Sequence, residues 1–252
     1  MTKTLWAKVF PSDPAQEAEF RLNSDVLEAP PSAMFMAAAT TILGTGLGFA
    51  QSAERMQGLW GDGSPVPLMS YSLIEYLMAI DLSDFDLLEV GGGSSTLFWA
   101  SRVKSVMTIE TDQGFIDTLR QSAPANVTFL HSPAETIPAA IQGLDRGFDL
   151  IAVDCASSRY AAAKAALPSL RPGGFILLDN SDWYPNTSSL LRDANLIQVD
   201  FPDFRPAHHF RCVTSLFLHP DFRPRPKFSR MPPSPVGGKD LGPVNRWDQV
   251  TD

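Results

Sequence analysis

The sequence predicts an α/β fold with a doubly wound, mainly parallel sheet of seven strands. Short apolar runs alternate with helical stretches from Phe85 to Leu218, and five of these runs end in polar residues or glycine. Strands joined by helices pair in parallel through right-handed crossovers. The last two runs, 196–201 and 213–218, have no helix between them, so we expect an antiparallel hairpin at one edge of the sheet.

The predicted elements follow one another at regular spacing. Ser72 and Glu75 have capping-box spacing and predict a helix that precedes the sheet. Asp112 is predicted to cap a later helix, and Arg171–Gly174 to form a turn before the fifth strand. The first five strands are expected over 85–90, 106–109, 127–130, 149–153 and 175–178, and the helices over 95–103, 113–121, 134–142, 159–170 and 186–193.

Composition divides the chain into three parts. We expect an N-terminal helical extension over 1–64, a sheet domain over 65–219 and a Pro-rich basic tail over 220–252. The tail is predicted to drape over the surface or to form no packed core. The alternative is a strap or lid over a site or a neighbouring subunit.

The extension contains a stretch without charge, Ala29 to Ala53. It predicts a helix over 33–43, a glycine-rich turn and a short helix over 51–59. Two prolines and three glycines lower its hydropathy below that of a Leu-rich membrane span. We therefore favour a buried or partner-facing helix over a membrane segment, and a homo-oligomer through 33–50 or through the tail is one consequence.

Charge and cysteine content exclude several function classes. The net charge of -8 and the pI of about 5.0 disfavour nucleic acid as a partner, because a phosphate polymer prefers a basic face. The two cysteines, Cys155 and Cys212, have no metal-ligand spacing and are too few for a disulfide scaffold. No apolar run follows the first charged residues, so we expect no secretory signal and a cytoplasmic protein.

Polar residues gather where the predicted strands end. In an open parallel sheet, ligands bind beyond the carboxyl ends of the strands. Glu110 ends the second strand 17 residues after Gly93, where a carboxylate can accept both ribose hydroxyls of an adenosine. The segments concerned are 89–93, 110–112, 131–134, 154–157 and 179–182.

The glycine turn after the first strand decides between adenosine ligands. A dinucleotide fingerprint has a third glycine at the sixth position, counted here from Gly91, and this position holds Thr96. No phosphate-binding loop with Gly-Lys-Ser/Thr is present. A nicotinamide-dependent oxidoreductase therefore stays only as an alternative.

The pattern Glu89-x-Gly91-x-Gly93-x-Ser95 resembles the first motif of class I S-adenosylmethionine-dependent methyltransferases. The resemblance extends over about 65–218, and the order and spacing of its blocks carry it. The blocks are 67–71, 93–98, 109–112, 148–154 and 170–180. It implies a Rossmann-like fold with a reversed final hairpin, and S-adenosylmethionine as the cofactor.

The resemblance also implies roles for single residues. Glu89 and Gly91 would meet the methionine end of the cofactor, and Gly93 would give backbone clearance. Glu110 would hold the ribose, and Asp154 would face the methyl-transfer site. The complete set expected to bind the cofactor is Glu89, Gly91, Gly93, Ser95, Glu110, Thr111, Ser132, Ala134 and Asp154, with Ser132 and Ala134 against the adenine.

Four side chains are candidates for the general base: Asp154, Asp179, His208 and His209. Asp154 with Asp179 and Asn180 also has the pattern of Mg²⁺-binding O-methyltransferases, and three oxygen ligands suit Mg²⁺. Those enzymes carry a lysine just after the aspartate of strand four, whereas the next lysine here is Lys164. We therefore favour a site without metal, leave Mg²⁺ open and assign no metal ligand.

The function predicted from these observations is in-line methyl transfer from S-adenosylmethionine to a small-molecule acceptor. Besides the oxidoreductase, the second alternative is a non-catalytic methyltransferase-like scaffold subunit. The sequence does not define the acceptor or its nucleophilic atom.

Overall fold

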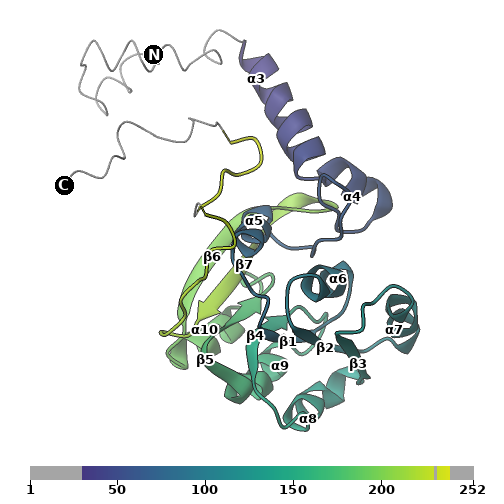
Figure 1. Cartoon of the computed structure of the whole chain (residues 1–252), viewed down its shortest axis with the longest axis vertical. Coiled ribbons are helices and arrows are strands. Elements are labelled where there is room, and N and C mark those ends of the chain that lie inside the picture. Colours follow the sequence, from purple (N-terminus) through teal and green to yellow (C-terminus); the bar gives the residue numbers. More distant parts are fainter. Residues whose placement is uncertain (1–29, 230–231, 239–252) are drawn as a thin grey trace, which may run out of the picture.

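The computed structural model describes residues 30–229 and 232–238. Its centre is a seven-stranded sheet in the order β3-β2-β1-β4-β5-β7-β6 (Figure 1). The strands are β1 (Asp86–Val90), β2 (Ser105–Glu110), β3 (Val127–His131), β4 (Phe148–Val153), β5 (Leu170–Leu178), β6 (Ile197–Arg205) and β7 (His208–Leu218). The first five pair in parallel, and β7 is antiparallel to both β5 and β6. The predicted fold class, including the edge hairpin, is confirmed.

Helices cover both faces of the sheet. Leu73, Ile74 and Leu77 of α5 (Tyr71–Ala79) pack with Phe98 and Trp99 of α6 (Ser94–Ala100) on one face. The opposite face is covered by α8 (Ile137–Gln142), α9 (Arg159–Ala166) and α10 (Pro185–Asp193). The connections also contain α7 (Gln113–Arg120) and the short 3-10 turns η2 (Ala134–Thr136) and η3 (Leu167–Ser169). This arrangement leaves the carboxyl ends of β1 to β5 along one edge.

Helix caps and turns predicted from neighbouring residues are confirmed only where no residue from a distant part of the chain binds the same groups. Asp112 accepts a hydrogen bond from the backbone N–H of Phe115 at 2.9 Å and caps α7, as predicted. The capping box at Ser72 was wrong, because α5 begins at Tyr71 and the N–H of Ser72 binds Asp203 of β6 instead. The expected turn at Arg171–Gly174 lies within β5, since Leu170 already pairs with Phe148.

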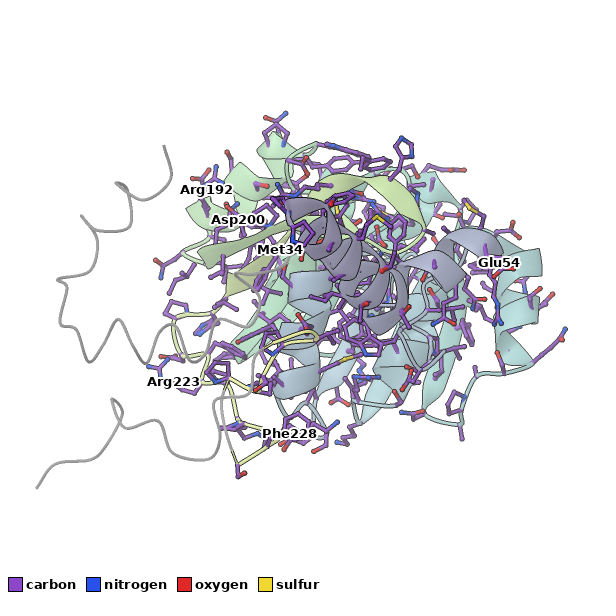
Figure 2. The ribbon with its side chains drawn as sticks, turned by 90° about the horizontal axis from the view of Figure 1, so that it is seen from above. Met34, Glu54, Arg192, Asp200, Arg223 and Phe228 are labelled. Atoms are coloured by element: carbon purple, nitrogen blue, oxygen red, sulfur yellow. The ribbon has the colours of Figure 1, made fainter. Side chains whose placement is uncertain are left out.

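The N-terminal extension begins, within the described residues, with a helix that leaves the body of the molecule (Figure 1). It consists of α3 (Pro31–Ala37), η1 (Ala38–Gly46), which has π-helical hydrogen bonding, and α4 (Phe49–Arg55). No residue of α3 is buried, and Met34 lies on the part that points toward the viewer in Figure 2. The expectation that this helix is buried is therefore wrong for the described chain, and a role facing a partner stays a prediction.

None of the described helices is by itself long and apolar enough to cross a membrane. One bent pair, Pro31–Gly46 with Phe49–Arg55 at 58°, passes the same test by length and composition.

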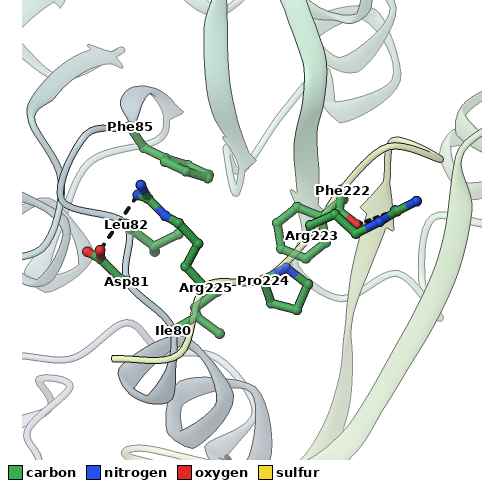
Figure 3. A pocket seen from close by; sticks show the side chains of 8 residues that line it. All are labelled: Ile80, Asp81, Leu82, Phe85, Phe222, Arg223, Pro224 and Arg225. Carbon is green, nitrogen blue, oxygen red and sulfur yellow. Dashed lines mark hydrogen bonds and ion pairs between the residues drawn. The ribbon is translucent and has the colours of Figure 1, made fainter. Parts of the chain in front are cut away.

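The described part of the tail lies against the sheet domain. The ring of Phe222 packs edge-on against Phe175 of β5 at 5.2 Å between centroids, inside the hydrophobic core. Beyond it, the chain passes the end of α5, where Arg225 pairs with Asp81 (Figure 3). Arg225 also pairs with Asp84. The predicted surface-draped segment thus forms a strap over 220–229. Residues 1–29, 230–231 and 239–252, which include the polar N-terminal stretch and the end of the tail, lie outside the described residues.

Candidate active site

The glycine turn lies between β1 and α6, at the carboxyl edge of the sheet. Gly91 has φ +97°, a conformation that L side chains rarely adopt, and a Cβ there would lie 2.7 Å from the backbone oxygen of Asp154. The N–H of Gly91 binds the carbonyl of Ile109 at 2.9 Å, and the N–H of Asp154 binds that of Val90 at 2.9 Å. Only glycine fits at this point, because the turn after β1 is pressed against the ends of β2 and β4.

Gly93 differs from Gly91 in having open space beside it. Its backbone is extended, with φ 170°, and the nearest atom to an added Cβ would be the hydroxyl of Ser95 at 3.7 Å. Its N–H is capped by the hydroxyl of Thr96 at 3.1 Å. The turn therefore leaves room for a ligand to lie directly against its backbone.

Glu89 is enclosed beneath this turn and is 1% exposed. Its two carboxylate oxygens accept hydrogen bonds from Ser95 and Thr96 of α6, both at 2.6 Å, and from Thr108 of β2 at 2.8 Å. Burial raises the pKa of Glu89 to about 7, against the lowering effect of these three hydroxyls. In the structure, Glu89 and Ser95 hold the start of α6 to the sheet, and their expected contact with a cofactor stays a prediction.

Glu110 ends β2 and faces the same turn. One carboxylate oxygen accepts a hydrogen bond from the N–H of Gly92 at 2.8 Å, and the other accepts from the N–H groups of Thr111 and Asp112 at 2.6 and 3.0 Å. The side chain of Glu110 is partly exposed, so its carboxylate can still accept a further hydrogen bond from a ligand. Glu110 is thus fixed where a hydroxyl-bearing ligand on the glycine turn would meet it.

The turn after β3 adds Ser132 and Ala134. The N–H of Ser132 binds the carbonyl of Glu110 at 3.0 Å, which ties this turn to the end of β2. The buried hydroxyl of Ser132 contacts that of Thr136 at 2.9 Å, and Ala134 begins η2. The structure therefore brings Ser132 next to Glu110, with Ala134 two residues further along the same turn, while the Ser132 hydroxyl is engaged within that turn.

A charged cluster lies at the ends of β4 and β5. The guanidinium of Arg159, on α9, donates to a carboxylate oxygen of Asp154 at 2.8 Å and to the amide oxygen of Asn180 at 3.2 Å. Asp179 is fully buried, accepts from the hydroxyl of Thr214 at 2.7 Å and pairs with Arg205 at 3.5 Å. Asp154 and Asp179 therefore belong to one network with two arginines.

Burial acts on both acidic members of this cluster, although to different extents. Burial, followed by the neighbouring Asp179 carboxylate, raises the pKa of Asp154 well above its usual range, and Arg159 acts in the opposite direction. Burial likewise raises the pKa of Asp179, against Arg205 and the hydroxyl of Thr214. Of the two, only Asp154 keeps surface, with 24% of its side chain exposed. Asp154 is therefore the carboxylate that a ligand at this edge can reach.

Comparison with known families agrees with this geometry. Residues 88–181, from β1 past the end of β5, match a family model described as a methyltransferase domain. The sheet has the reversed final hairpin expected for such domains, with β7 between β5 and β6. The sheet domain therefore has a class I methyltransferase-like fold, and its central part matches the methyltransferase model. No curated protein sequence matches the chain.

Solved structures similar to the chain include several methyltransferases. The O-methyltransferase TomG from Streptomyces achromogenes, in complex with SAM, is 17% identical over 59% of this chain and 77% of its own, with a TM-score of 0.46. A precorrin-6y C5,15-methyltransferase from Geobacter metallireducens is 12% identical over 59% and 86%, with a TM-score of 0.48. Fibrillarin from Aeropyrum pernix, with S-adenosyl-L-methionine bound, is 17% identical over 58% and 74%, with a TM-score of 0.47.

The two neighbouring histidines lie on the hairpin that also carries Arg205 of the charged cluster. His208 and His209 begin β7 at the tip of the hairpin, not in the loop predicted for them. His208 is the cross-strand partner of Arg205, whose guanidinium lies 3.5 Å from Asp179. The side chains of both histidines contact the ring of Phe210, and their part in the reaction stays a prediction.

A divalent metal does not fit the cluster. Within the part of the chain that the structure describes, no group of three or more His, Cys, Asp or Glu side chains is arranged to hold a metal ion. The oxygens of Asp154 and Asn180 that the sequence offered to Mg²⁺ both accept hydrogen bonds from Arg159. A metal ion between these oxygens would lie against the positively charged guanidinium of Arg159, which already occupies the oxygen atoms that would have to coordinate the ion.

Two members of the charged cluster, Arg159 and Arg205, were not predicted from the sequence. The related enzymes suggested a lysine after the aspartate of strand four. In this chain the basic residue that follows Asp154 is Arg159, in the first turn of α9. Its position five residues after Asp154 was the available signal. Arg205 gave no such signal, because it comes from β6 and meets Asp179 only through the fold.

Proposed function

We propose that the chain is an S-adenosylmethionine-dependent methyltransferase that acts on a small-molecule acceptor by in-line methyl transfer. One observation carries the proposal: a methyltransferase domain has, on its glycine turn, an open backbone face at Gly93 with Glu110 beside it. The open face suits a ligand that lies against bare backbone, and the carboxylate suits its ribose hydroxyls.

The proposed cofactor contacts follow the strand ends in order. The turn 91–93 meets the methionine end, with Glu89 and Ser95 supporting the turn from below. Glu110 and Thr111 hold the ribose, and the turn of Ser132 and Ala134 borders the adenine. Asp154 faces the sulfonium side, next to the turn through the bond between its N–H and the carbonyl of Val90.

Methyl transfer asks mainly for orientation and for exclusion of water, because the reaction is a displacement at one carbon. In this chain the partly exposed Asp154 is the proposed base for an acceptor hydroxyl or ammonium, and its raised pKa brings proton uptake closer to neutral pH. Asp179 is enclosed and is proposed to act on the position of neighbouring groups. We assign no proton transfer to His208 and His209. In the proposal they lie only on the side of the site where the acceptor binds.

A small-molecule acceptor is supported by an aromatic surface beside Arg159. A cavity of about 510 Å³ between α9 and α10 is lined by Tyr160, Trp183 and Tyr184. Tyr184 also stacks on the guanidinium of Arg159 at 4.5 Å, so one wall of this cavity adjoins the charged cluster. Aromatic walls bind flat or apolar molecules well, and the acidic chain is ill suited to a nucleic acid.

Calorimetric titration with S-adenosylmethionine and with S-adenosylhomocysteine tests the proposal. Saturable binding of either compound to the purified full chain, with one site per chain, is the expected result. Absence of binding at millimolar concentration contradicts it. The same titration with NADH, followed by its fluorescence, separates the oxidoreductase alternative, and binding of no nucleotide favours the scaffold alternative.

A further inference from the structure

Three oxygen atoms at the ends of β4 and β5 surround one guanidinium. Arg159 donates to a carboxylate oxygen of Asp154 at 2.8 Å, to the amide oxygen of Asn180 at 3.2 Å, and to the backbone carbonyl of Asp179. A carboxylate, an amide and a carbonyl oxygen from adjacent strand ends form a donor set that suits a hard divalent cation. Here the cation among them is an arginine side chain.

Arg159 is held in this position from its other sides as well. Its Nε donates to the carbonyl of Cys155 at 2.8 Å, one turn earlier in the chain, and the ring of Tyr184 covers its guanidinium at 4.5 Å. The residue is 7% exposed. An arginine with this many fixed contacts keeps one orientation, because each hydrogen bond and the stacked ring restrict the planar group.

The charges of the cluster balance without another ion. Asp154 and Asp179 supply two carboxylates, and Arg159 and Arg205 pair with them at 2.8 and 3.5 Å. A divalent ion between Asp154 and Asn180 would displace the guanidinium from its oxygen partners into a buried position. An unpaired buried charge is strongly unfavourable, so the arginine and a metal ion exclude one another.

We infer that Arg159 is the resident cation of this site, in the place that a divalent metal ion would take between β4 and β5. It is a positioning residue: it holds Asp154 and Asn180 in one arrangement at the acceptor side. Its part in methyl transfer rests on the proposed function, whereas its exclusion of metal rests only on these contacts.

Titration with Mn²⁺, followed by the loss of the free-ion signal in electron paramagnetic resonance, tests this inference on the full chain. Wild type is expected to show no Mn²⁺ site that depends on Asp154. Arg159→Ala removes the cation and leaves the oxygens, so it should bind Mn²⁺ roughly tenfold more tightly than wild type or better, since a freed carboxylate suits the ion. The double variant Arg159→Ala with Asp154→Asn should lose that gain.

Two further variants serve as matched controls. Arg159→Lys keeps a positive charge, so this variant should not gain the Mn²⁺ site. If Arg159 acted only through its packing, the lysine variant would not be expected to differ from the neutral variants. If Arg159→Ala does not fold, as judged by circular dichroism, Arg159→Gln keeps the length without the charge and takes its place. The inference is overturned if wild type has an Mn²⁺ site that Asp154→Asn abolishes, or if a folded neutral variant gains no site.

The result of the Mn²⁺ titration can be distinguished from the test of the proposed function. S-adenosylhomocysteine titrations of wild type with EDTA and with added Mg²⁺ should give the same affinity. If wild type binds no S-adenosylhomocysteine, the proposed function fails while the Mn²⁺ result still decides the role of Arg159. If binding requires Mg²⁺ and Asp154→Asn removes that requirement, the inference fails and the proposed function stands.

Discussion

The carboxylate of Glu110 accepts a hydrogen bond from the backbone N–H of Gly92 at 2.8 Å. This bond joins the end of β2 to the glycine turn after β1, two segments that are 18 residues apart in the chain. It fixes the acidic side chain beside the open backbone face at Gly93, so that a ligand on the turn meets the carboxylate at once. Four predictions follow from this edge of the sheet and from the packing behind it.

Glu110→Gln should weaken binding of S-adenosylhomocysteine by roughly tenfold or more, because a hydrogen bond to a charged group contributes about 1.5–3 kcal/mol. The amide oxygen can still accept from Gly92, but the amide NH2 cannot accept from Thr111 and Asp112, so circular dichroism checks that the fold persists. Calorimetry measures the affinity. Asp117→Asn on the exposed side of α7 is the matched control and should leave the affinity unchanged. Equal affinities of the Gln variant and wild type would exclude the ribose role of Glu110.

Gly91→Ala and Gly93→Ala should have opposite effects on stability and on binding. At Gly91 the positive φ and the carbonyl of Asp154 at 2.7 Å oppose a Cβ, so the free energy of unfolding should fall by about 2 kcal/mol or more. At Gly93 the extended backbone accepts alanine, and stability should hold. The added methyl group occupies the open face, so affinity for S-adenosylhomocysteine should fall.

Urea unfolding and calorimetry on both variants check this pair. A Gly93→Ala protein that binds the ligand as wild type does would show that the open face is not the cofactor side. A Gly91→Ala protein as stable as wild type would contradict the close packing of the turn on β4.

Glu89→Gln should reduce the dependence of stability on pH between about 5 and 7. Because burial raises the pKa of Glu89 from 4.5 to about 7, the folded protein holds a proton that the unfolded chain releases in this range. Stability contributed by this group is therefore full below pH 4.5 and is lost as the pH rises to about 7. The loss is roughly 3 kcal/mol, and the Gln variant has no proton to lose.

Urea unfolding at pH 5, 6, 7 and 8 measures the difference in slope between the two proteins. Taking the difference matters, because burial raises the pKa values of Asp154 and Asp179 in the same direction. Glu135→Gln, an exposed carboxyl in η2, is the control and should keep the wild-type slope. Parallel curves for wild type and Glu89→Gln would contradict the prediction.

Phe222→Ala should destabilise the protein by about 3 kcal/mol, because the ring is 8% exposed and packs edge-on against Phe175 in the core. Phe228→Ala is the matched control in the same strap. Its ring is 51% exposed, so the change should stay within about 0.5 kcal/mol. Thermal unfolding of both variants measures the contrast. Equal effects would mean that the strap over 220–229 does not pack as described.

Elements whose cause is local could be predicted from the sequence. Asp112 caps α7 because its side chain needs only the N–H of Phe115, three residues on. Gly91 was predicted to lie in the glycine turn after the first strand, and there it has a backbone conformation that few other residues accept. The alternation of strands and helices, and with it the α/β fold class, also comes from short-range periodicity, whereas the methyltransferase-like fold was implied by the resemblance of the motif blocks.

Elements decided by distant neighbours could not be predicted in this way. The N–H of Ser72 meets Asp203, 131 residues later, and this contact replaces the expected capping box. β7 begins at His208 because the hairpin pairs out to its tip, so both histidines lie in a strand and not in the expected loop. Leu170 joins β5 because Phe148 lies opposite, although Arg171–Gly174 has the composition of a turn.

By itself, the sequence determined the order of strands and helices, the glycine turn and the carboxylates at the strand ends, because these depend on residues close together in the chain. Only the tertiary structure decided what those carboxylates meet. Asp154 and Asp179 come from neighbouring strands, and Arg159 and Arg205 reach them from α9 and from β6. Pairing between charges falls steeply with distance, so which cation stands beside which carboxylate depends on the packed fold.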